Sequence, residues 1–201
     1  MFKRVLCSIL ASAALVLSPA TEVLAGPATP PTSTEAIDVL TVAADQSEAS
    51  TTRPMPADIC AFTLVTHPGH TNADCVTHYT VRIERAAASK VGSSAPLPGN
   101  LAYSYCPTVT GTMWNLGWYS TVSQAFCVTP PVYVVALPGY TRCNSSWWIR
   151  TTWCGVGANT GWYADGGDNV LVPGVPTYSA SLRVWMNAYG YFGVRCWGAF
   201  C

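Results

Sequence analysis

Arginine and aromatic residues alternate with apolar residues along three segments late in the chain. In residues 146–154, 181–187 and 191–197, every second side chain belongs to an apolar set. Flat rings stack on the apolar faces of sugars, and arginine donates hydrogen bonds in a planar fork. If the segments are neighbouring strands, their outward side chains form one candidate ligand-binding face, made of Trp148, Arg150, Arg183, Trp185, Tyr191, Arg195 and Trp197.

The same alternation predicts which side chains point into the core. Along residues 146–154 it places Trp147, Ile149 and Trp153 inward. The alternative role of the outward set is structural, because an arginine stacked on an exposed ring stabilises a sheet by about 0.5–1 kcal/mol.

Three histidines are the chain's weak candidates for metal ligands. His67, His70 and His78 lie within twelve residues, and Asp74 lies among them. Imidazole and carboxylate groups bind Zn²⁺ or Cu²⁺, but this spacing matches no specific metal motif. We therefore expect ordinary surface histidines, no bound metal and no cofactor.

Residues 165–169 form an acidic segment with the sequence Asp-Gly-Gly-Asp-Asn, which predicts a turn. Its oxygen atoms suit Ca²⁺, but the segment matches no complete calcium motif. Asp165 and Asp168 are also the only carboxylate side chains after Glu84. A glycoside hydrolase would have to use this pair or the segment around the histidines.

Cysteines define the framework that must position these groups. A basic start, an apolar run and small residues before Gly26 predict a signal peptide over residues 1–25, so the protein is expected to be secreted and extracellular. Cys7 leaves with it, and an even number of cysteines then predicts disulfides. Closeness in sequence and a predicted hairpin favour four pairs: Cys60 with Cys75, Cys106 with Cys127, Cys143 with Cys154, and Cys196 with Cys201.

The remaining chain is predicted to contain a leader and one all-β domain. Residues 26–56 are rich in Pro, Thr and Ser and predict a disordered leader, with a short helix over residues 34–45. The folded domain is expected over residues 57–201, as a disulfide-stapled sandwich or barrel of short antiparallel strands. Strands are expected over 60–66, 75–84, 101–106, 114–121, 126–137, 146–155, 170–172, 178–187 and 191–197, with a turn at 187–190.

Charge and composition exclude several functions. The chain has 10 Lys and Arg against 10 Asp and Glu, so no basic surface for nucleic acid is expected. The apolar run near the start is too short for a membrane span, and no basic amphipathic segment favours membrane lysis. No serine-nucleophile elbow, phosphate loop or dinucleotide fingerprint occurs.

These observations favour a secreted, non-catalytic binding protein for an extracellular glycan or cell-envelope polymer. The alternative is a secreted protease inhibitor or protein-interaction module that presents residues 138–142, Pro-Gly-Tyr-Thr-Arg, as a rigid loop. A small secreted hydrolase is the least favoured interpretation, because ionisable groups are scarce. Oligomeric state and ligand identity do not follow from the sequence.

Overall fold

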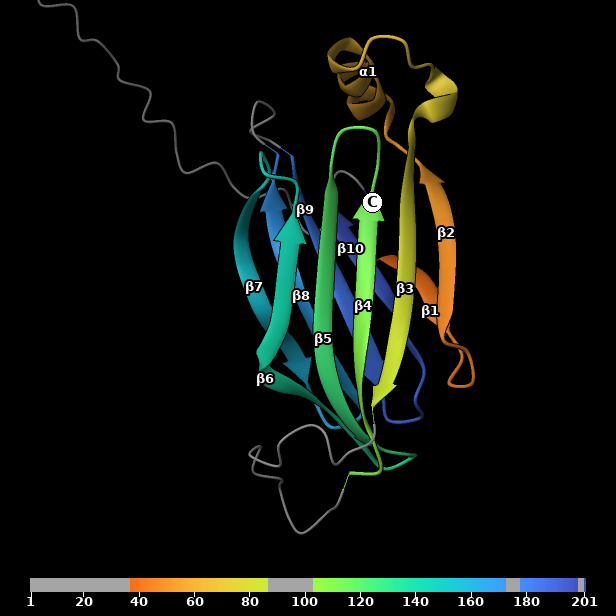
Figure 1. The fold of residues 1–201 in the computed structure, drawn as a ribbon, viewed down its shortest axis with the longest axis vertical. Helices are drawn as coiled ribbons and strands as arrows, with labels where there is room; N and C mark the ends of the chain where they lie inside the picture. Colours follow the sequence, from red (N-terminus) through yellow and green to blue (C-terminus); the bar gives the residue numbers. More distant parts are fainter. Residues whose placement is uncertain (1–36, 87–102, 173–177, 199–200) are drawn as a thin grey trace, which may run out of the picture. The chain divides into compact units, whose positions relative to one another are not determined.

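The all-β class is confirmed by a computed structural model, which describes residues 37–86, 103–172, 178–198 and 201 (Figure 1). Two antiparallel sheets of five strands each form a sandwich. The strands are β1 (Ile37–Val42), β2 (Glu48–Pro54), β3 (Val76–Ala86), β4 (Cys106–Trp114), β5 (Tyr119–Thr129), β6 (Tyr133–Ser145), β7 (Arg150–Asn159), β8 (Tyr163–Leu171), β9 (Ser179–Asn187) and β10 (Phe192–Gly198).

Sheet A has the strand order β1-β10-β9-β8-β7, and sheet B has the order β2-β3-β4-β5-β6. The chain therefore passes from one sheet to the other between β1 and β2, and again between β6 and β7. Most neighbours within a sheet are consecutive in sequence, because an antiparallel pair needs only a short turn. The short turns alternate between the two ends of the sandwich (Figure 1).

The core lies between the inner faces of the two sheets. On β3, the predicted alternation is confirmed, because Tyr79 and Val81 are fully buried and Ile83 is almost so. Facing side chains from sheet A include Leu182, Val184 and Met186 of β9, all fully buried. A strand with one face on the core shows this period of two, which is why the pattern is readable from sequence.

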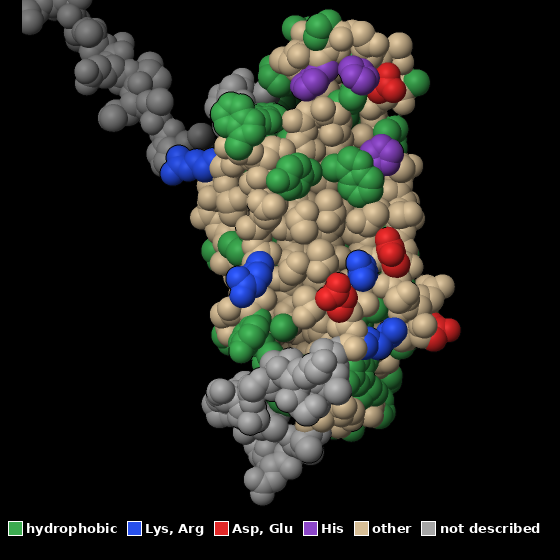
Figure 2. All heavy atoms as spheres, in the orientation of Figure 1, with side chains coloured by type: hydrophobic (Ala, Val, Ile, Leu, Met, Phe, Trp, Pro, Cys, Tyr) green, Lys and Arg blue, Asp and Glu red, His purple; other side chains and the backbone are tan. Residues whose placement is uncertain are grey.

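The outer face of sheet B is covered mainly by hydroxyl side chains. Thr80, Thr112 and Thr121 lie in register across β3, β4 and β5. Thr112 and Thr121 are hydrogen-bonded at 3.1 Å. Few charged side chains appear over these strands (Figure 2), in keeping with the low charge content of the chain.

All four predicted disulfides are present in the structure. Cys106 and Cys127 join the neighbouring strands β4 and β5. The bond between Cys143 and Cys154 joins β6 to β7 and so connects the two sheets. The other two bonds, Cys60 with Cys75 and Cys196 with Cys201, attach short terminal or peripheral segments to strands β3 and β10.

The predicted start of the folded domain at residue 57 is wrong. Strands β1 and β2 lie within the segment predicted as a leader, and β1 occupies the place of the predicted helix over residues 34–45. Val42 is buried in the core, whereas β2 alternates between half-exposed and exposed side chains. An edge strand of this kind is held largely by backbone pairing with its neighbour, which polar composition does not reveal. The predicted signal peptide and residues 26–36 lie outside the described residues.

The predicted strand over residues 60–66 is helix α1 (Ala57–Thr66). Pro56 precedes it, Asp58 lies in its first turn, and Ile59 and Thr63 are buried one turn apart. A short apolar run can be a strand or a helix, so tertiary contacts decided the outcome here. A 3-10 helix (Asn72–Asp74) follows and leads into β3, so the disulfide joins Cys60 of α1 to Cys75, the residue directly before β3.

Several other predicted bounds also differ from the structure. The predicted strand over 114–121 spans the turn between β4 and β5, and the one over 126–137 spans the turn at Pro130 and Pro131. Residues 165–169 are not a loop but the middle of β8. The turn at residues 187–190 is confirmed, since the Gly190 amide donates to the Asn187 carbonyl at 3.0 Å. Among the described residues, no helix has the length and apolar character to cross a membrane.

Candidate functional site

The outer face of sheet A carries a continuous layer of rings, arginines and carboxylates. We call it the aromatic–arginine layer. Backbone register brings its central row together, because Gly167, Arg183, Arg195 and Asp38 pair in sequence across β8, β9, β10 and β1. The members of the layer are Asp38, Trp153, Tyr163, Asp165, Arg183, Trp185, Arg195 and Trp197.

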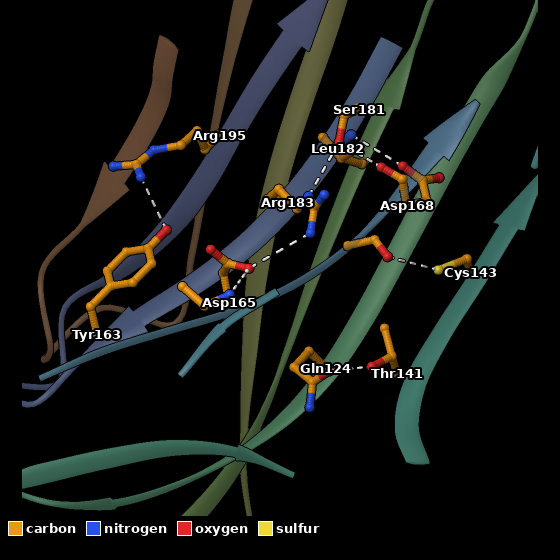
Figure 3. Close-up of polar contacts among 12 residues, drawn as sticks. Gln124, Thr141, Cys143, Tyr163, Asp165, Asp168, Ser181, Leu182, Arg183 and Arg195 are labelled. Atoms are coloured by element: carbon orange, nitrogen blue, oxygen red, sulfur yellow. Dashed lines mark hydrogen bonds and ion pairs between the residues drawn. The ribbon is translucent and has the colours of Figure 1, made fainter. Parts of the chain in front are cut away.

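Arg183 lies at the centre of this layer. Its guanidinium carbon is 4.1 Å from the ring centroid of Trp153 and 5.6 Å from that of Trp197. Nη1 lies 3.8 Å from an oxygen of Asp165, and Nε donates to the hydroxyl of Ser181 at 3.2 Å (Figure 3). Burial lowers the pKa of Arg183, while the nearby acids oppose this shift, so the group stays charged at neutral pH. The guanidinium is thus held in one position between two indole rings.

Arg195 is the cross-strand neighbour of Arg183 but has its own partners. It donates to both oxygens of Asp38, at 2.7 and 2.9 Å, and to the Tyr163 hydroxyl at 3.1 Å. These hydrogen bonds to Asp38 raise the pKa of Arg195. Each arginine is paired with a separate carboxylate. The repulsion between the two neighbouring positive charges is therefore offset locally.

Trp185 forms the most buried part of the layer. Its ring stacks with Tyr163 at a centroid distance of 6.0 Å, and only 6% of the residue is exposed. The indole Nε1 is buried without a hydrogen-bond partner in the described part of the chain. Burial raises the pKa of Tyr163, so its hydroxyl remains a neutral donor and acceptor through the physiological range. Trp185 therefore supports the layer rather than presenting a ring to solvent.

Glycines beneath the layer let these side chains lie close to the sheet. A Cβ at Gly157 would lie 2.1 Å from Asp165 Oδ1. At Gly167 it would lie 2.2 Å from Arg183 Cδ, and at Gly193 it would lie 2.8 Å from the Trp185 ring. The space that a Cβ would fill is taken by the Asp165 carboxylate, the Arg183 side chain and the Trp185 ring. The glycines of β7, β8 and β10 are thus part of the site's geometry.

The structure brings four of the seven predicted face residues into this layer: Arg183, Trp185, Arg195 and Trp197. Tyr191 is exposed at the β9–β10 turn, and Arg150 is exposed at the first residue of β7. Trp148 lies elsewhere, in a pocket beside α1. The solvent-facing ladder is thus corrected to a compact layer in which Trp185 is buried. The ligand-binding role of the set stays a prediction.

Two tryptophans predicted to be in the core are not there. A register shift on β7 between Thr151 and Trp153 inserts one extra residue, which turns Trp153 to the outer face. Trp147 precedes β7 in a turn where alternation does not apply, and it is 95% exposed. Ile149 is buried as predicted.

Asp165 and Asp168 lie on opposite faces of sheet A. Asp165 accepts from the Ala158 amide at 3.0 Å on the outer side. Asp168 is fully buried between the sheets, where it accepts from the Ser120 hydroxyl and, at 3.1 Å, from the Leu182 amide (Figure 3). Burial raises the pKa of Asp168. These acids cannot flank one sugar bond, so they do not form the carboxylate pair that a glycoside hydrolase would have to use.

The three histidines take separate places. His67 Nδ1 lies 3.1 Å from the Thr63 carbonyl, and His78 stacks on Trp114 at 5.0 Å. His70 lies 3.6 Å from Asp74, whose pKa is lowered mainly by a hydrogen bond from the Thr71 amide. No three His, Cys, Asp or Glu side chains among the described residues converge in a way that could hold a metal.

A small pocket lies at the end of the sandwich where α1 packs. It has a volume of about 30 Å³, enough for one or two water molecules or the tip of a side chain. Rings form much of its wall, from Phe62, Trp118, Trp148 and Tyr178. Its size limits it to a small group unless neighbouring side chains move.

Sequence reasoning missed Asp38, Tyr163 and Asp165 as members of the layer. A signal for the last two was present, because Tyr163, Asp165 and Gly167 alternate with Ala164 and Gly166 as in a strand. The two glycines made the segment read as a turn instead. Asp38 carried no such signal, because its role depends on β1 pairing with β10.

Comparison with known proteins gives no relative for this chain. No protein-family model matches it, and neither a curated protein nor a solved structure matches it.

Proposed function

We propose that the protein is a secreted, non-catalytic binding protein for an extracellular glycan or cell-envelope polymer, and that the aromatic–arginine layer is its binding surface. The observation that carries this proposal is the position of Arg183 between two partly exposed indole rings. Rings supply stacking surface for a sugar, and the fixed guanidinium supplies directed hydrogen bonds.

Pre-organisation supports the same proposal. Glycines below the layer, the ion pair with Asp165 and the hydrogen bond to Ser181 hold Arg183 before any ligand arrives. A site whose side chains are already ordered loses less conformational entropy on binding. The four disulfides and the expected signal peptide are compatible with a protein that functions outside the cell.

The test is a tryptophan-fluorescence titration of the oxidised protein with soluble glycans and cell-wall fragments. A saturable change with one glycan class is expected. Trp153→Ala combined with Trp197→Ala should weaken that binding at least about tenfold, because both stacking surfaces are lost. Trp147→Ala is the matched control, since Trp147 is exposed outside the layer. An unchanged affinity in a folded double variant, or no response to any glycan, contradicts the proposal.

Secretion has its own test, which is sequencing of the N-terminus of the protein recovered from culture medium. Gly26 is the expected first residue. A start further along would show that some of the segment before β1 is also removed, whereas retention of Met1 contradicts signal-peptide cleavage.

A second candidate function, protease inhibition or protein interaction, is favoured by a bulge on the edge strand β6. Register shifts between Gln124 and Phe126 of β5, so residues 137–140 of β6 have no opposite partners there. Tyr140 is 50% exposed at this bulge, and Arg142 is exposed beside it. An assay against a panel of secreted proteases, with Arg142→Ala as the variant, separates this candidate from glycan binding.

A further inference from the structure

Three turns lie at the end of the sandwich opposite α1 (Figure 1) and are connected by hydrogen bonds. They are residues 130–132 between β5 and β6, residues 160–162 between β7 and β8, and residues 188–191 between β9 and β10. The Ala188 amide donates to the Trp162 carbonyl at 2.9 Å, and the Val134 amide donates to the Gly161 carbonyl at 2.7 Å. The three turns therefore form one ordered surface.

This surface presents large apolar side chains to solvent. We call it the aromatic turn cluster; its members are Val132, Trp162, Tyr189 and Tyr191, which are exposed by 50%, 59%, 60% and 45%. The rings of Trp162 and Tyr189 lie beside each other at a centroid distance of 6.5 Å. Exposed apolar groups gathered on an ordered surface indicate an interaction site rather than scattered surface residues.

Two polar side chains in and beside these turns, Asn187 and Thr160, form hydrogen bonds within the turns. Oδ1 of Asn187 accepts from the amides of Tyr189 and Tyr191, each at 3.0 Å. The hydroxyl of Thr160 donates to the Tyr163 carbonyl at 3.0 Å and accepts from the Tyr163 amide at 3.2 Å. These side chains are thus already engaged, which leaves the exposed rings as the main contact surface of the cluster.

The lack of charged residues in the three turns favours an uncharged lipid surface as the partner. None of the residues in the three turns is Lys, Arg, Asp or Glu. The adjoining β1–β2 turn, which a Cβ at Gly190 would approach to 3.2 Å at Ala44, carries Asp45, and Arg85 donates to carbonyls of the same turn, so one acid and one base lie beside the cluster. Attraction to an anionic surface therefore has no source in the cluster. Tryptophan and tyrosine combine an apolar ring with one polar atom, which suits the headgroup level of a bilayer.

From these observations we propose that the aromatic turn cluster docks the domain peripherally onto a zwitterionic lipid bilayer, with Trp162 and Tyr189 entering the headgroup region. The proposal does not depend on the aromatic–arginine layer, because the cluster lies on turns and not on the sheet face. It also requires no membrane-spanning segment.

The test is co-sedimentation of the full oxidised protein with phosphatidylcholine vesicles. Binding is expected, and it should change little when salt is raised or when phosphatidylserine is added. Trp162→Ala combined with Tyr189→Ala should lower the partition coefficient at least about tenfold, because two rings leave the interface. Trp147→Ala is the matched control, since it removes an even more exposed tryptophan outside the cluster.

A second variant keeps the proposal testable if the double variant folds poorly. Trp162→Phe retains an apolar ring, so binding should persist, while the quenching of tryptophan fluorescence by brominated lipid should fall. The proposal is overturned by no sedimentation with phosphatidylcholine, by binding that needs phosphatidylserine, or by quenching that Trp162→Phe leaves unchanged. It is likewise overturned if the double variant loses binding to a soluble glycan or protein but not to vesicles.

Discussion

Gly193→Ala is the substitution whose effect follows most directly from the geometry of the aromatic–arginine layer. Gly193 lies on β10, opposite Trp185 of β9 and Thr41 of β1. A Cβ there would lie 2.1 Å from the backbone oxygen of Leu40 and 2.8 Å from the Trp185 ring. Trp185 is buried under Tyr163, so the carbonyl and the indole have little freedom to move.

These distances indicate how much free energy of unfolding the substitution should remove. Ordinary contact begins at 3.4 Å, so β1 would have to retreat by roughly 1.3 Å at Leu40, and the Trp185 ring would have to shift as well. Both changes disrupt packing that is already tight. We expect a loss of about 3 kcal/mol, the upper part of the usual range for overpacking. For a domain of this size, the midpoint of thermal unfolding should fall by roughly 6–12 °C.

The assay is thermal unfolding under non-reducing conditions, followed by near-ultraviolet circular dichroism, which reports the packing of the tryptophans. Gly117→Ala is the matched control, because a Cβ there would lie 3.4 Å from His67, 3.8 Å from Asn115 and 3.9 Å from Trp148, all at ordinary contact distance. The control should unfold within about 3 °C of the wild type, since its cost is below about 1 kcal/mol. If Gly193→Ala is as stable as this control, Gly193 is not needed to make room for Trp185 and β1.

Three further predictions concern the framework of the domain. Burial raises the pKa of Asp168 above its unfolded value of 3.8, so its contribution to stability is present at acidic pH and is lost as pH rises through the folded pKa. The unfolding midpoint of the wild type relative to Asp168→Asn should therefore fall as pH rises above 3.8, and a constant difference contradicts this. Replacing Cys143 and Cys154 by alanine opens an 11-residue separation and should lower the free energy of unfolding by about 3 kcal/mol in guanidinium titrations, whereas a loss below about 1 kcal/mol would show that the bond constrains little. Asp38→Asn removes a partly exposed pair with Arg195 and should cost less than about 1 kcal/mol, an effect that should shrink at about 1 M salt; a cost that salt leaves unchanged would mean that the pair acts by packing rather than by charge.

Local pattern determined several features of this protein without any help from tertiary structure. The alternation from Cys75 to Ile83 identified both strand β3 and its buried face. The disulfide pairs also followed from closeness in sequence, although only Cys106 and Cys127 join antiparallel neighbours and Cys60 lies on α1 rather than on a hairpin strand. Short-range signals of this kind are present in the residues themselves, since a strand on a core has a period of two.

Tertiary structure decided the features that depend on distant partners. β1 and the polar strand β2 exist because β10 and β3 offer them free edges, and α1 is a helix although its apolar run also fits a strand. One extra residue on β7 turned Trp153 to the outer face, because a shift of one residue exchanges the two faces of a strand. Likewise Trp185 is buried because Tyr163 and Gly193 come from neighbouring strands. Composition and spacing therefore predicted which residue types form the face, while the pairing of strands far apart in sequence decided which of them reach solvent.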